Sequence, residues 1–288
     1  MTPRERGLLL LTQQLGDPDR NPLTPSQYSQ LASQVRAAPR RDPDQELAIS
    51  DLTSMGFDFL TGEHILHLLS QEAQLERYLS RGAAEGCYPI PRSSPLYPRE
   101  LLENLGEESP PCLWAKGDLS LLSGTMIGLV GSRDILPQNY RFAQEVGRQT
   151  ALAGLTLISG NARGADLAAQ TSCLANGGRV VSVLADSLRE KPAVPNLLYL
   201  SEDGYDLPFS SQRALQRNRL IHILPRCVYV AQVRPYRSGT WSGTVKNLTN
   251  GWSGVMCLDD GSEGARALIA MGASPATTAQ LTHLQNLR

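Results

Sequence analysis

From Thr125 onward, short apolar runs alternate with amphipathic segments, and this alternation constrains the fold more than any other feature of the chain. The runs TMIGLVGSR, LTLISG, RVVSVLA, NLLYLSE, RCVYVAQV and GVMCLDD predict six buried strands. Helical spacing predicts helices over 138–153, 164–175, 210–224, 238–248 and 265–271. Apolar strands separated by helices form a mostly parallel sheet that helices cover on both faces. We therefore predict an α/β fold with a mostly parallel, Rossmann-like sheet.

A small all-α domain is predicted ahead of this sheet, over residues 1–85. Thr24 and Gln27 form a capping-box pattern at a helix start, and further short helices follow the polar stretch AAPRRDPDQ. The pattern is compatible with a sterile-alpha-motif or helix-hairpin-helix bundle, and equally with a packing module that contacts no ligand. The proline-rich stretch 86–120 has the composition of a connector that packs on the sheet. We assign it to the second predicted domain, 86–288.

Positive charge is concentrated in the middle of the chain. Residues 1–127 hold 11 Lys and Arg against 17 Asp and Glu, a net charge of −6, whereas residues 128–240 hold 13 against 8, a net charge of +5. Nearly all of the cations in that middle segment are arginines, whose planar fork pairs well with phosphate. The imbalance favours an anionic ligand, although ordinary protein surfaces also show such fluctuations.

The first predicted strand ends in a glycine turn, Gly131-Ser132-Arg133. Glycine lets the backbone turn tightly and approach an anion closely, while Ser132 adds a hydroxyl and Arg133 a guanidinium. Only GxxGSR stands here, and the GxGxxG fingerprint of dinucleotide-binding folds is absent, so we predict no nicotinamide or flavin cofactor.

The second predicted strand ends in a similar turn that contains Gly160, Asn161, Arg163 and Gly164. A helix begins directly after it, so free backbone N–H groups at the helix start add to the attraction for an anion. Asp166 falls in the first turn of that helix, where a capping role is the simplest interpretation. Two such turns at neighbouring strand ends predict a groove.

Two further segments lie where the same groove would be. Arg217, Asn218 and Arg219 precede the apolar run LIHIL, and the arginines suit phosphate while the amide suits phosphate or a base edge. A solvated basic helix face is the alternative interpretation. Ser238 and Gly239 belong to SGTWSGT, which joins a strand to a helix and offers hydroxyl and N–H groups; its tryptophan could stack on a base or be buried.

Motifs of catalysis, metal binding and membrane insertion are absent from the sequence. It contains no GxxxxGK[ST] loop, no GxSxG elbow and no HExxH, so we predict a protein that is not an enzyme and has no metal. His64 and His67 lie one helical turn apart, without further ligands beside them. The five scattered cysteines suggest no disulfide framework, and no apolar run is long enough for a membrane span, so we expect a cytoplasmic protein.

In this order, the motifs resemble those of the DNA-processing protein A family, also called DprA or Smf. The resemblance rests on YPRELLENL, PPCLWAKGD, GLVGSR, SGNARGAD, LQRNRLIHIL, SGTWSGT and GSEGARALIAMGA, and extends from about Tyr97 to Ala273. It implies an extended Rossmann-like fold that binds single-stranded DNA and loads the RecA recombinase in natural transformation, commonly as a homodimer. By matching position it implies that Arg133 and Arg163 are the main phosphate contacts and that Ser132, Asn218 and Arg219 line the same groove.

A second hypothesis comes from another class of protein. Related Rossmann-like folds sense or hydrolyse nucleotide-derived small molecules, in phage defence for example, and the same Gly, Ser and Arg loops could hold one nucleotide phosphate. The cytokinin-activating relatives carry PGGxGTxxE with a catalytic glutamate. The corresponding stretch here, 237–241, has no acidic residue at that spacing, which weighs against a hydrolase and leaves a sensor open.

Overall fold

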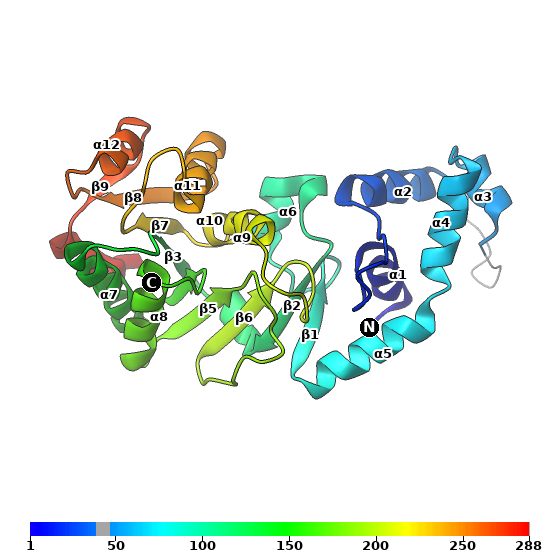
Figure 1. Cartoon of the computed structure of the whole chain (residues 1–288), viewed down its shortest axis with the longest axis horizontal. Helices are drawn as coiled ribbons and strands as arrows, with labels where there is room; N and C mark the ends of the chain where they lie inside the picture. Colours follow the sequence, from blue (N-terminus) through cyan, green and yellow to red (C-terminus); the bar gives the residue numbers. More distant parts are fainter. Residues whose placement is uncertain (39–46, 288) are drawn as a thin grey trace.

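The computed structural model describes residues 1–38 and 47–287 and contains one nine-stranded sheet (Figure 1). Its strands are β1 (Cys87–Pro91), β2 (Cys112–Gly117), β3 (Met126–Val130), β4 (Thr156–Ser159), β5 (Arg179–Val183), β6 (Leu197–Ser201), β7 (Cys227–Val230), β8 (Gly254–Leu258) and β9 (Ser274–Ala276). They lie side by side in the order β1-β2-β6-β5-β4-β3-β7-β8-β9. The predicted mostly parallel α/β sheet is confirmed.

All neighbouring strands from β6 to β9 are parallel, whereas β1 and β2 are antiparallel additions at one edge. The predicted connector, 86–120, therefore supplies two strands of the sheet. Three strands were not predicted, and all three lie at or next to an edge: β1, β2 and β9. Both outermost strands contain proline, which lacks an N–H group and is tolerated at sheet edges because no partner strand needs that group.

Helices cover both faces of the sheet. The helices of the sheet domain are α6 (Arg99–Leu105), α7 (Pro137–Leu152), α8 (Ala165–Ala175), α9 (Ser211–Gln216), α10 (Asn218–Ile223), α11 (Gly239–Asn250) and α12 (Glu263–Ala270), with short 3-10 segments η1 (Gly106–Glu108), η2 (Leu119–Ser123) and η3 (Thr278–Leu287). α7, α8 and η3 pack on one face, and α6, α10 and α12 pack on the other.

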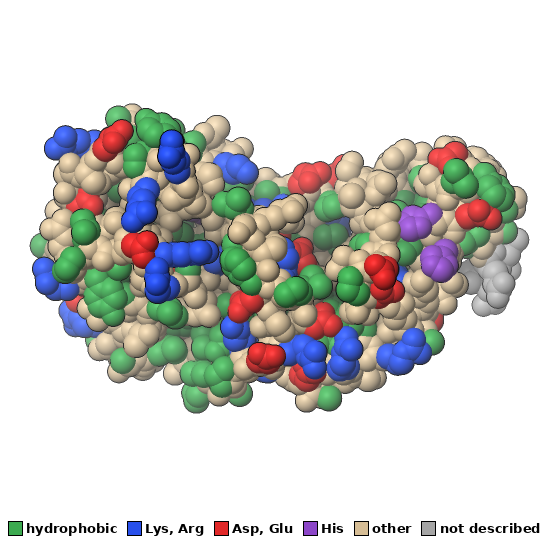
Figure 2. Space-filling model, viewed as in Figure 1, with side chains coloured by type: hydrophobic (Ala, Val, Ile, Leu, Met, Phe, Trp, Pro, Cys, Tyr) green, Lys and Arg blue, Asp and Glu red, His purple; other side chains and the backbone are tan. Residues whose placement is uncertain are grey.

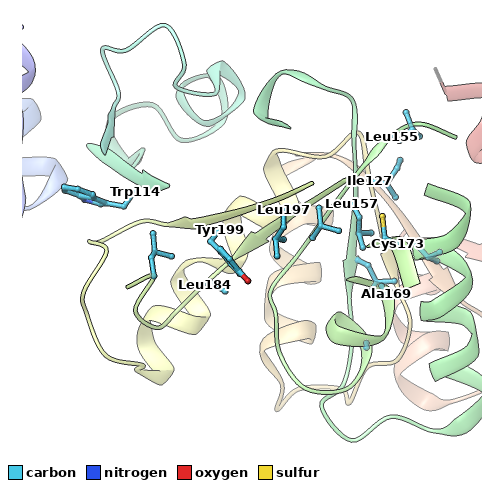
Figure 3. Close-up of a cluster of buried hydrophobic side chains, with 14 of the residues drawn as sticks. Trp114, Ile127, Leu155, Leu157, Ala169, Cys173, Leu184, Leu197 and Tyr199 are labelled. Atoms are coloured by element: carbon cyan, nitrogen blue, oxygen red, sulfur yellow. The ribbon is translucent and has the colours of Figure 1, made fainter. Parts of the chain in front are cut away.

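The core on the α7–α8 face is continuous along the sheet (Figure 3). Ile127, Leu157 and Leu197 come from three strands of the sheet and belong to the same buried cluster as Ala169 of α8. Strand residues alternate between the two faces, so the residues next to these belong to the opposite core. A strand with apolar residues on both faces appears in sequence as a continuous apolar run, and this is why the parallel strands were predictable.

The N-terminal helices form a separate bundle at one end of the molecule, beside β1 (Figure 1). They are α1 (Pro3–Thr12), α2 (Pro25–Ala37), α3 (Ile49–Ser54), α4 (Phe59–Leu69) and α5 (Glu72–Ala84), and we call residues 1–85 the helical module. The predicted capping box at Thr24 is present at the start of α2. Most of the polar stretch that we expected after α2 lies outside the described residues.

The helical module and the sheet share part of their core. Trp114 of β2 is buried against Tyr78 of α5, with ring centroids 5.2 Å apart, and its indole N–H donates to Gln13 Oε1 at 2.9 Å. Tyr78 also donates to Asp206 at 2.7 Å, and Arg81 pairs with the same carboxylate at 2.9 Å. These contacts join the module to the sheet edge, and the domain boundary near residue 85 stays a prediction.

The segment 210–224 forms two helices where the sequence predicted one. α9 ends at Gln216 and α10 begins at Asn218, with Arg217 between them. The guanidinium of Arg217 is buried and Nη1 donates to the carbonyl of Val183 at the end of β5. Anchoring this side chain to the sheet places the break between the helices at this residue.

Candidate nucleic-acid interface

The strand order brings two loops together that are far apart in sequence. β3 lies between β4 and β7, so the chain passes outward through β4, β5 and β6 and then returns to the other side of β3. In open parallel sheets, a crevice forms beyond the carboxyl ends of the strands at such a reversal. A hollow of about 410 Å³ lies there, lined by residues 130–134 at the end of β3, by Arg234 and residues 237–240 after β7, and by parts of α9 and α10. We call it the main hollow.

The β3 loop forms one wall of the main hollow. The carbonyl of Gly131 accepts a hydrogen bond from Thr240 Oγ1 at 3.0 Å, and the carbonyl of Ser132 accepts one from the N–H of Ala165 at 3.2 Å. The side chain of Arg133 is exposed and makes no hydrogen bond or ion pair within residues 1–38 and 47–287. The loop is therefore anchored through its backbone while its guanidinium is available to a ligand.

The β4 loop packs directly on the β3 loop. Gly164 has φ = +89°, and a Cβ at this position would collide with the carbonyl oxygens of Ser132 and Arg133. A residue with a side chain would have to push the loops apart, so glycine is required here for packing as well as for conformation. Asn161 also has positive φ, at +56°, which asparagine tolerates better than most residues.

Asp166, at the start of α8, holds the β4 loop closed. Its Oδ2 accepts hydrogen bonds from the N–H groups of Gly160 at 3.1 Å and Ala162 at 3.3 Å. Burial raises the pKa of this carboxyl from 3.8 to about 6, and nearby Arg217 opposes the shift. The predicted capping role thus takes the form of a hydrogen-bonded loop closure beneath the hollow.

Four exposed arginines surround the main hollow. Arg163 pairs with Asp134 at 2.7 Å, and Arg234 approaches the same carboxylate at 3.7 Å. Arg133 and Arg237 line the hollow, and neither side chain has an ion-pair partner among the described residues. Two of the four guanidinium groups share the carboxylate of Asp134 and the other two have no ion pair among the described residues, so the local charge is positive.

A second hollow, the side hollow, continues from the first. Gly160, Asn161, Arg163, Asp186, Lys191 and Phe209 line it, and it shares Arg133, Ala162 and Arg217 with the main hollow. Together they form one groove that crosses the ends of β3, β4 and β7. Figure 2 shows Lys and Arg side chains over the left part of the view, where these strand ends and α11 lie, and a second group along the lower edge toward α5.

Arg217 lies in the floor between the two hollows, and its main contacts are internal. It is only 8% exposed, and burial lowers the pKa of its guanidinium. The backbone of Gly160 passes so close to the guanidinium that any Cβ there would overlap it. The geometry makes Arg217 a support for the β4 loop, with one edge at the groove.

Asn218, Ser238 and Gly239 line the main hollow as the sequence placed them. The amide of Asn218 donates to the carbonyl of Gly239 at 3.2 Å, which ties α10 to the start of α11. Ser238 caps α11 by accepting from the N–H of Trp241 at 3.1 Å, and its hydroxyl donates to the carbonyl of Arg234 at 2.9 Å. These residues shape the wall through hydrogen bonds among themselves.

Arg219 lies outside the groove. It pairs with Glu202 at 2.7 Å and donates to the carbonyl of Glu108 at 3.0 Å, and it lines a separate hollow beside the helical module. The side chain of Glu202 is 2% exposed, and burial raises the pKa of its carboxyl against the opposing effect of Arg219. The expectation that Arg219 shares a groove with Arg133 does not hold in the structure, because the buried carboxylate of Glu202, directly after β6, engages the guanidinium.

Sequence reasoning missed Arg234, Tyr236 and Arg237, which follow β7. The motif RPYR directly before the Ser238 cap was the available signal, because it repeats the pattern of arginines at a strand-to-helix turn. Tyr236 is 73% exposed and has φ = +63°, an unusual conformation for a bulky residue. Its ring packs on the half-buried Trp241, with centroids 4.9 Å apart, so Tyr236 presents the outer aromatic surface.

The histidines of the helical module have local partners. His64 Nε2 lies 2.8 Å from the carbonyl of Asn21, and His67 Nε2 lies 2.9 Å from the amide of Gln71. Among the described residues, no group of three or more His, Cys, Asp or Glu side chains is placed to hold a metal ion. Within the same residues, every helix is too short or too polar to cross a bilayer.

Comparison with known proteins identifies relatives across most of the chain. The family described as DNA recombination-mediator protein A matches residues 89–285. The DNA processing protein DprA of Streptococcus pneumoniae is 31% identical over 226 residues, which cover 74% of this chain and 75% of that protein. DprA of Bacillus subtilis is 27% identical over 205 residues, which cover 67% and 68%.

Solved structures give the same result for the fold. The X-ray structure of DprA from Streptococcus pneumoniae superposes with a TM-score of 0.75 at 25% identity and covers 98% of this chain and 97% of that one. DNA processing protein A from Helicobacter pylori, whose structure was described for its single-stranded DNA binding mode, superposes with a TM-score of 0.58 at 21% identity. That match covers 70% of this chain and 95% of the Helicobacter pylori chain and supports the fold.

Proposed function

Because the chain belongs to the DNA recombination-mediator protein A family, we propose that the groove at the ends of β3, β4 and β7 binds single-stranded DNA through its phosphates. The protein acts in DNA processing as a recombination mediator, as its family does. One observation carries the site assignment: exposed arginines from three loops converge on one groove, and Arg133 and Arg237 face it without an ion pair among the described residues.

Each part of the groove has a role in this proposal. Arg133 and Arg163 contact phosphates, and Arg237 adds a third cation at the far wall. The exposed pair between Arg163 and Asp134 is worth about 0–1 kcal/mol, so exchanging the carboxylate for a phosphate costs little. The β3 and β4 loops are held in place by Gly131, Ser132 and Gly164.

The remaining predicted residues support the contact surface. Gly160 and Asn161 form the side hollow, while Asn218, Ser238 and Gly239 form the far wall of the main hollow. Arg217 supports the floor. Arg219 has no DNA contact in this proposal, because Glu202 engages it elsewhere.

A strand fits the groove better than a single nucleotide does. The two hollows join at Arg133 and Arg217, and cations lie along both of them. A mononucleotide has one phosphate group and would leave most of these arginines without a counterion. The number of arginines along the groove therefore favours a polymer over the single nucleotide of the sensor hypothesis.

Binding of fluorescent oligo(dT) at several salt concentrations tests the proposal. Arg133→Ala, Arg163→Ala and Arg237→Ala should each weaken binding about tenfold or more, since a charge-assisted hydrogen bond contributes about 1.5–3 kcal/mol. Each should also reduce the slope of log affinity against log salt by about 0.7, the value for one phosphate on a single strand. Wild-type protein that fails to bind at low salt would refute the proposal.

Arg226→Ala is the matched control. Arg226 is exposed and directly precedes β7, so it lies at the amino ends of the parallel strands, away from the groove at their carboxyl ends. The Arg226→Ala variant should bind oligo(dT) with the affinity and the salt slope of wild type. AMP serves as the competitor that tests the nucleotide-sensor hypothesis. If AMP displaces oligo(dT) at a concentration close to that of the oligonucleotide counted in nucleotides, a single nucleotide is the better ligand and the sensor hypothesis replaces the DNA-binding proposal.

Two partners follow from the family assignment as proposals. A recombination mediator acts on a recombinase, so we propose that the protein loads RecA on single-stranded DNA, which a strand-exchange assay with DNA-coating competitor protein measures. We also propose a homodimer in the cytoplasm, checked by light scattering across a concentration series and by cell fractionation.

A further inference from the structure

We propose a second phosphate-binding site between the helical module and the segment after β1, formed by Arg4, Arg36 and Arg92, which binds the phosphates of a nucleic-acid strand outside the groove. The identity of the ligand as a DNA strand rests on the proposed function. The phosphate chemistry rests on the residues of this hollow alone. The family match begins at residue 89, so Arg4 and Arg36 belong to the part of the chain that it does not cover.

The three arginines surround a small hollow of about 210 Å³. Arg4 comes from the first turn of α1, Arg36 from the last turn of α2 and Arg92 from the segment directly after β1. On α2 the lining residues Tyr28, Ala32 and Arg36 are spaced by four, so they lie on one face of the helix. Three separate elements therefore bring guanidinium groups to one place.

None of these arginine side chains has an ion pair or hydrogen bond within the described residues. Arg6, two positions after Arg4, shows the contrast, because it pairs with both Glu72 and Glu76 of α5 on the other side of α1. The surrounding segment is acidic, with a net charge of −6 over residues 1–127 from 11 basic and 17 acidic side chains. No carboxylate of the described residues pairs with these three arginines, so their guanidinium groups are open to an anionic ligand.

Arg92 is held in place without a counterion. Its guanidinium lies 4.9 Å from the centroid of the Tyr28 ring, and its backbone N–H donates to the carbonyl of Pro111 at 2.9 Å. A cation over an aromatic face is attracted to the ring and keeps its N–H groups available at the edge. The side chain is half-buried, so little further ordering is needed when it binds an anion.

The lining indicates an oxyanion that brings an apolar group with it. The arginine forks match phosphate oxygens, and Ser93 adds a hydroxyl at the rim. Leu8, Ala32 and Leu102 supply apolar surface, which lowers the local dielectric and strengthens each charge interaction. A nucleotide unit of a strand supplies both parts, because its phosphate meets the arginines and its sugar or base covers the apolar surface.

The test compares a module variant with a groove variant in the full chain. Arg4→Ala/Arg36→Ala should reduce the salt slope for a long oligo(dT) by about 1.4, corresponding to two phosphates on a single strand. It should also abolish the residual binding that remains in Arg133→Ala/Arg163→Ala. Both module residues are exposed, so the folded state should be unchanged. Arg77→Ala is the control, since Arg77 is an exposed arginine of α5 in the same module.

The outcomes separate this proposal from the proposed function. If Arg4→Ala/Arg36→Ala binds oligo(dT) with the affinity and the salt slope of wild type, the second site is overturned and the proposal for the groove is unaffected. Calorimetry with pyrophosphate measures phosphate binding at the second site in the absence of DNA. A further outcome is that pyrophosphate binding depends on Arg4 and Arg36 while neither wild type nor any variant binds oligo(dT). That result overturns the proposed DNA binding of the groove, and it overturns a DNA strand as the ligand of the second site. If neither ligand depends on these residues, the second site does not exist.

Discussion

The ion pair between Arg219 and Glu202 gives the sharpest test of which arginines support the fold and which bind DNA. The carboxylate of Glu202 is 2% exposed and receives two hydrogen bonds from Arg219, at 2.7 and 3.2 Å. Replacing Arg219 by methionine keeps most of the side chain's length and removes its charge. The carboxylate is then buried without a partner.

The expected cost follows from this burial. Removing one partner of a buried ion pair destabilises a protein by about 3–5 kcal/mol, whereas replacing both partners by apolar residues is often neutral. We therefore expect Arg219→Met to lower the free energy of unfolding by about 3 kcal/mol or more, and Arg219→Met/Glu202→Leu to recover most of the loss. Glu202 already has a raised pKa in the folded protein, and losing Arg219 raises it further.

A raised carboxyl pKa also sets the sign of the pH dependence. A group whose pKa is higher in the folded state adds stability below its unfolded pKa, and that contribution disappears as the pH rises through the folded pKa. The deficit of Arg219→Met should therefore shrink on acidification. Urea unfolding at acidic and neutral pH, followed by the fluorescence of buried Trp114, measures this directly.

Arg133→Met is the matched comparison, because it removes an exposed arginine of the groove. It should change stability by no more than about 0.5 kcal/mol and weaken oligo(dT) binding about tenfold. Arg219→Met should show a large loss of stability, whereas the fraction that is folded should bind oligo(dT) as wild type does. A stable Arg219→Met variant that has lost DNA affinity would refute the structural role, and with it the reasoning that separates the two arginines.

Two further predictions concern the groove. Asp166→Asn should gain stability relative to wild type as the pH rises from 4 toward 7, by at most about 3 kcal/mol, because burial raises the wild-type pKa from 3.8 to about 6; thermal unfolding at several pH values checks it, and a constant difference would contradict it. Tyr236→Ala should weaken oligo(dT) binding by about 1–3 kcal/mol while leaving the salt slope unchanged, since stacking on a base involves no counterion; Tyr236→Phe should bind normally, and equal loss in both variants would rule out stacking.

The two edges of the sheet show where sequence patterns lose information. β3 to β8 have apolar residues on both faces and were predicted from their apolar runs. β1 and β9 contain prolines and lie at the edges, where pairing with a neighbour on one side is sufficient. Their strand conformation depends on the adjacent strand, and for β1 the local sequence suggested a connector instead.

Arg217 and Arg219 show the same limit within the candidate site. Both belong to one basic motif, RNR, and their residue types do not distinguish them. Positions two apart on a helix point to nearly opposite sides, so one guanidinium reaches Val183 beneath the groove and the other reaches Glu202. Which carboxylate or carbonyl lies on each side is decided by the packing of β5, β6 and η1 around the two arginines.

The alternating sheet, the glycine turns and their common location were determined by the sequence, because strand burial, turn conformation and the crevice at a chain reversal all follow from local residue patterns. The assignment of partners to each arginine was decided only by the tertiary structure. An ion pair depends on which distant segments the strand order brings within a few ångströms. Arg133 and Arg237 face the groove without an ion pair among the described residues, and Arg219 is bound to a buried carboxylate, although all three are arginines of the same basic segment.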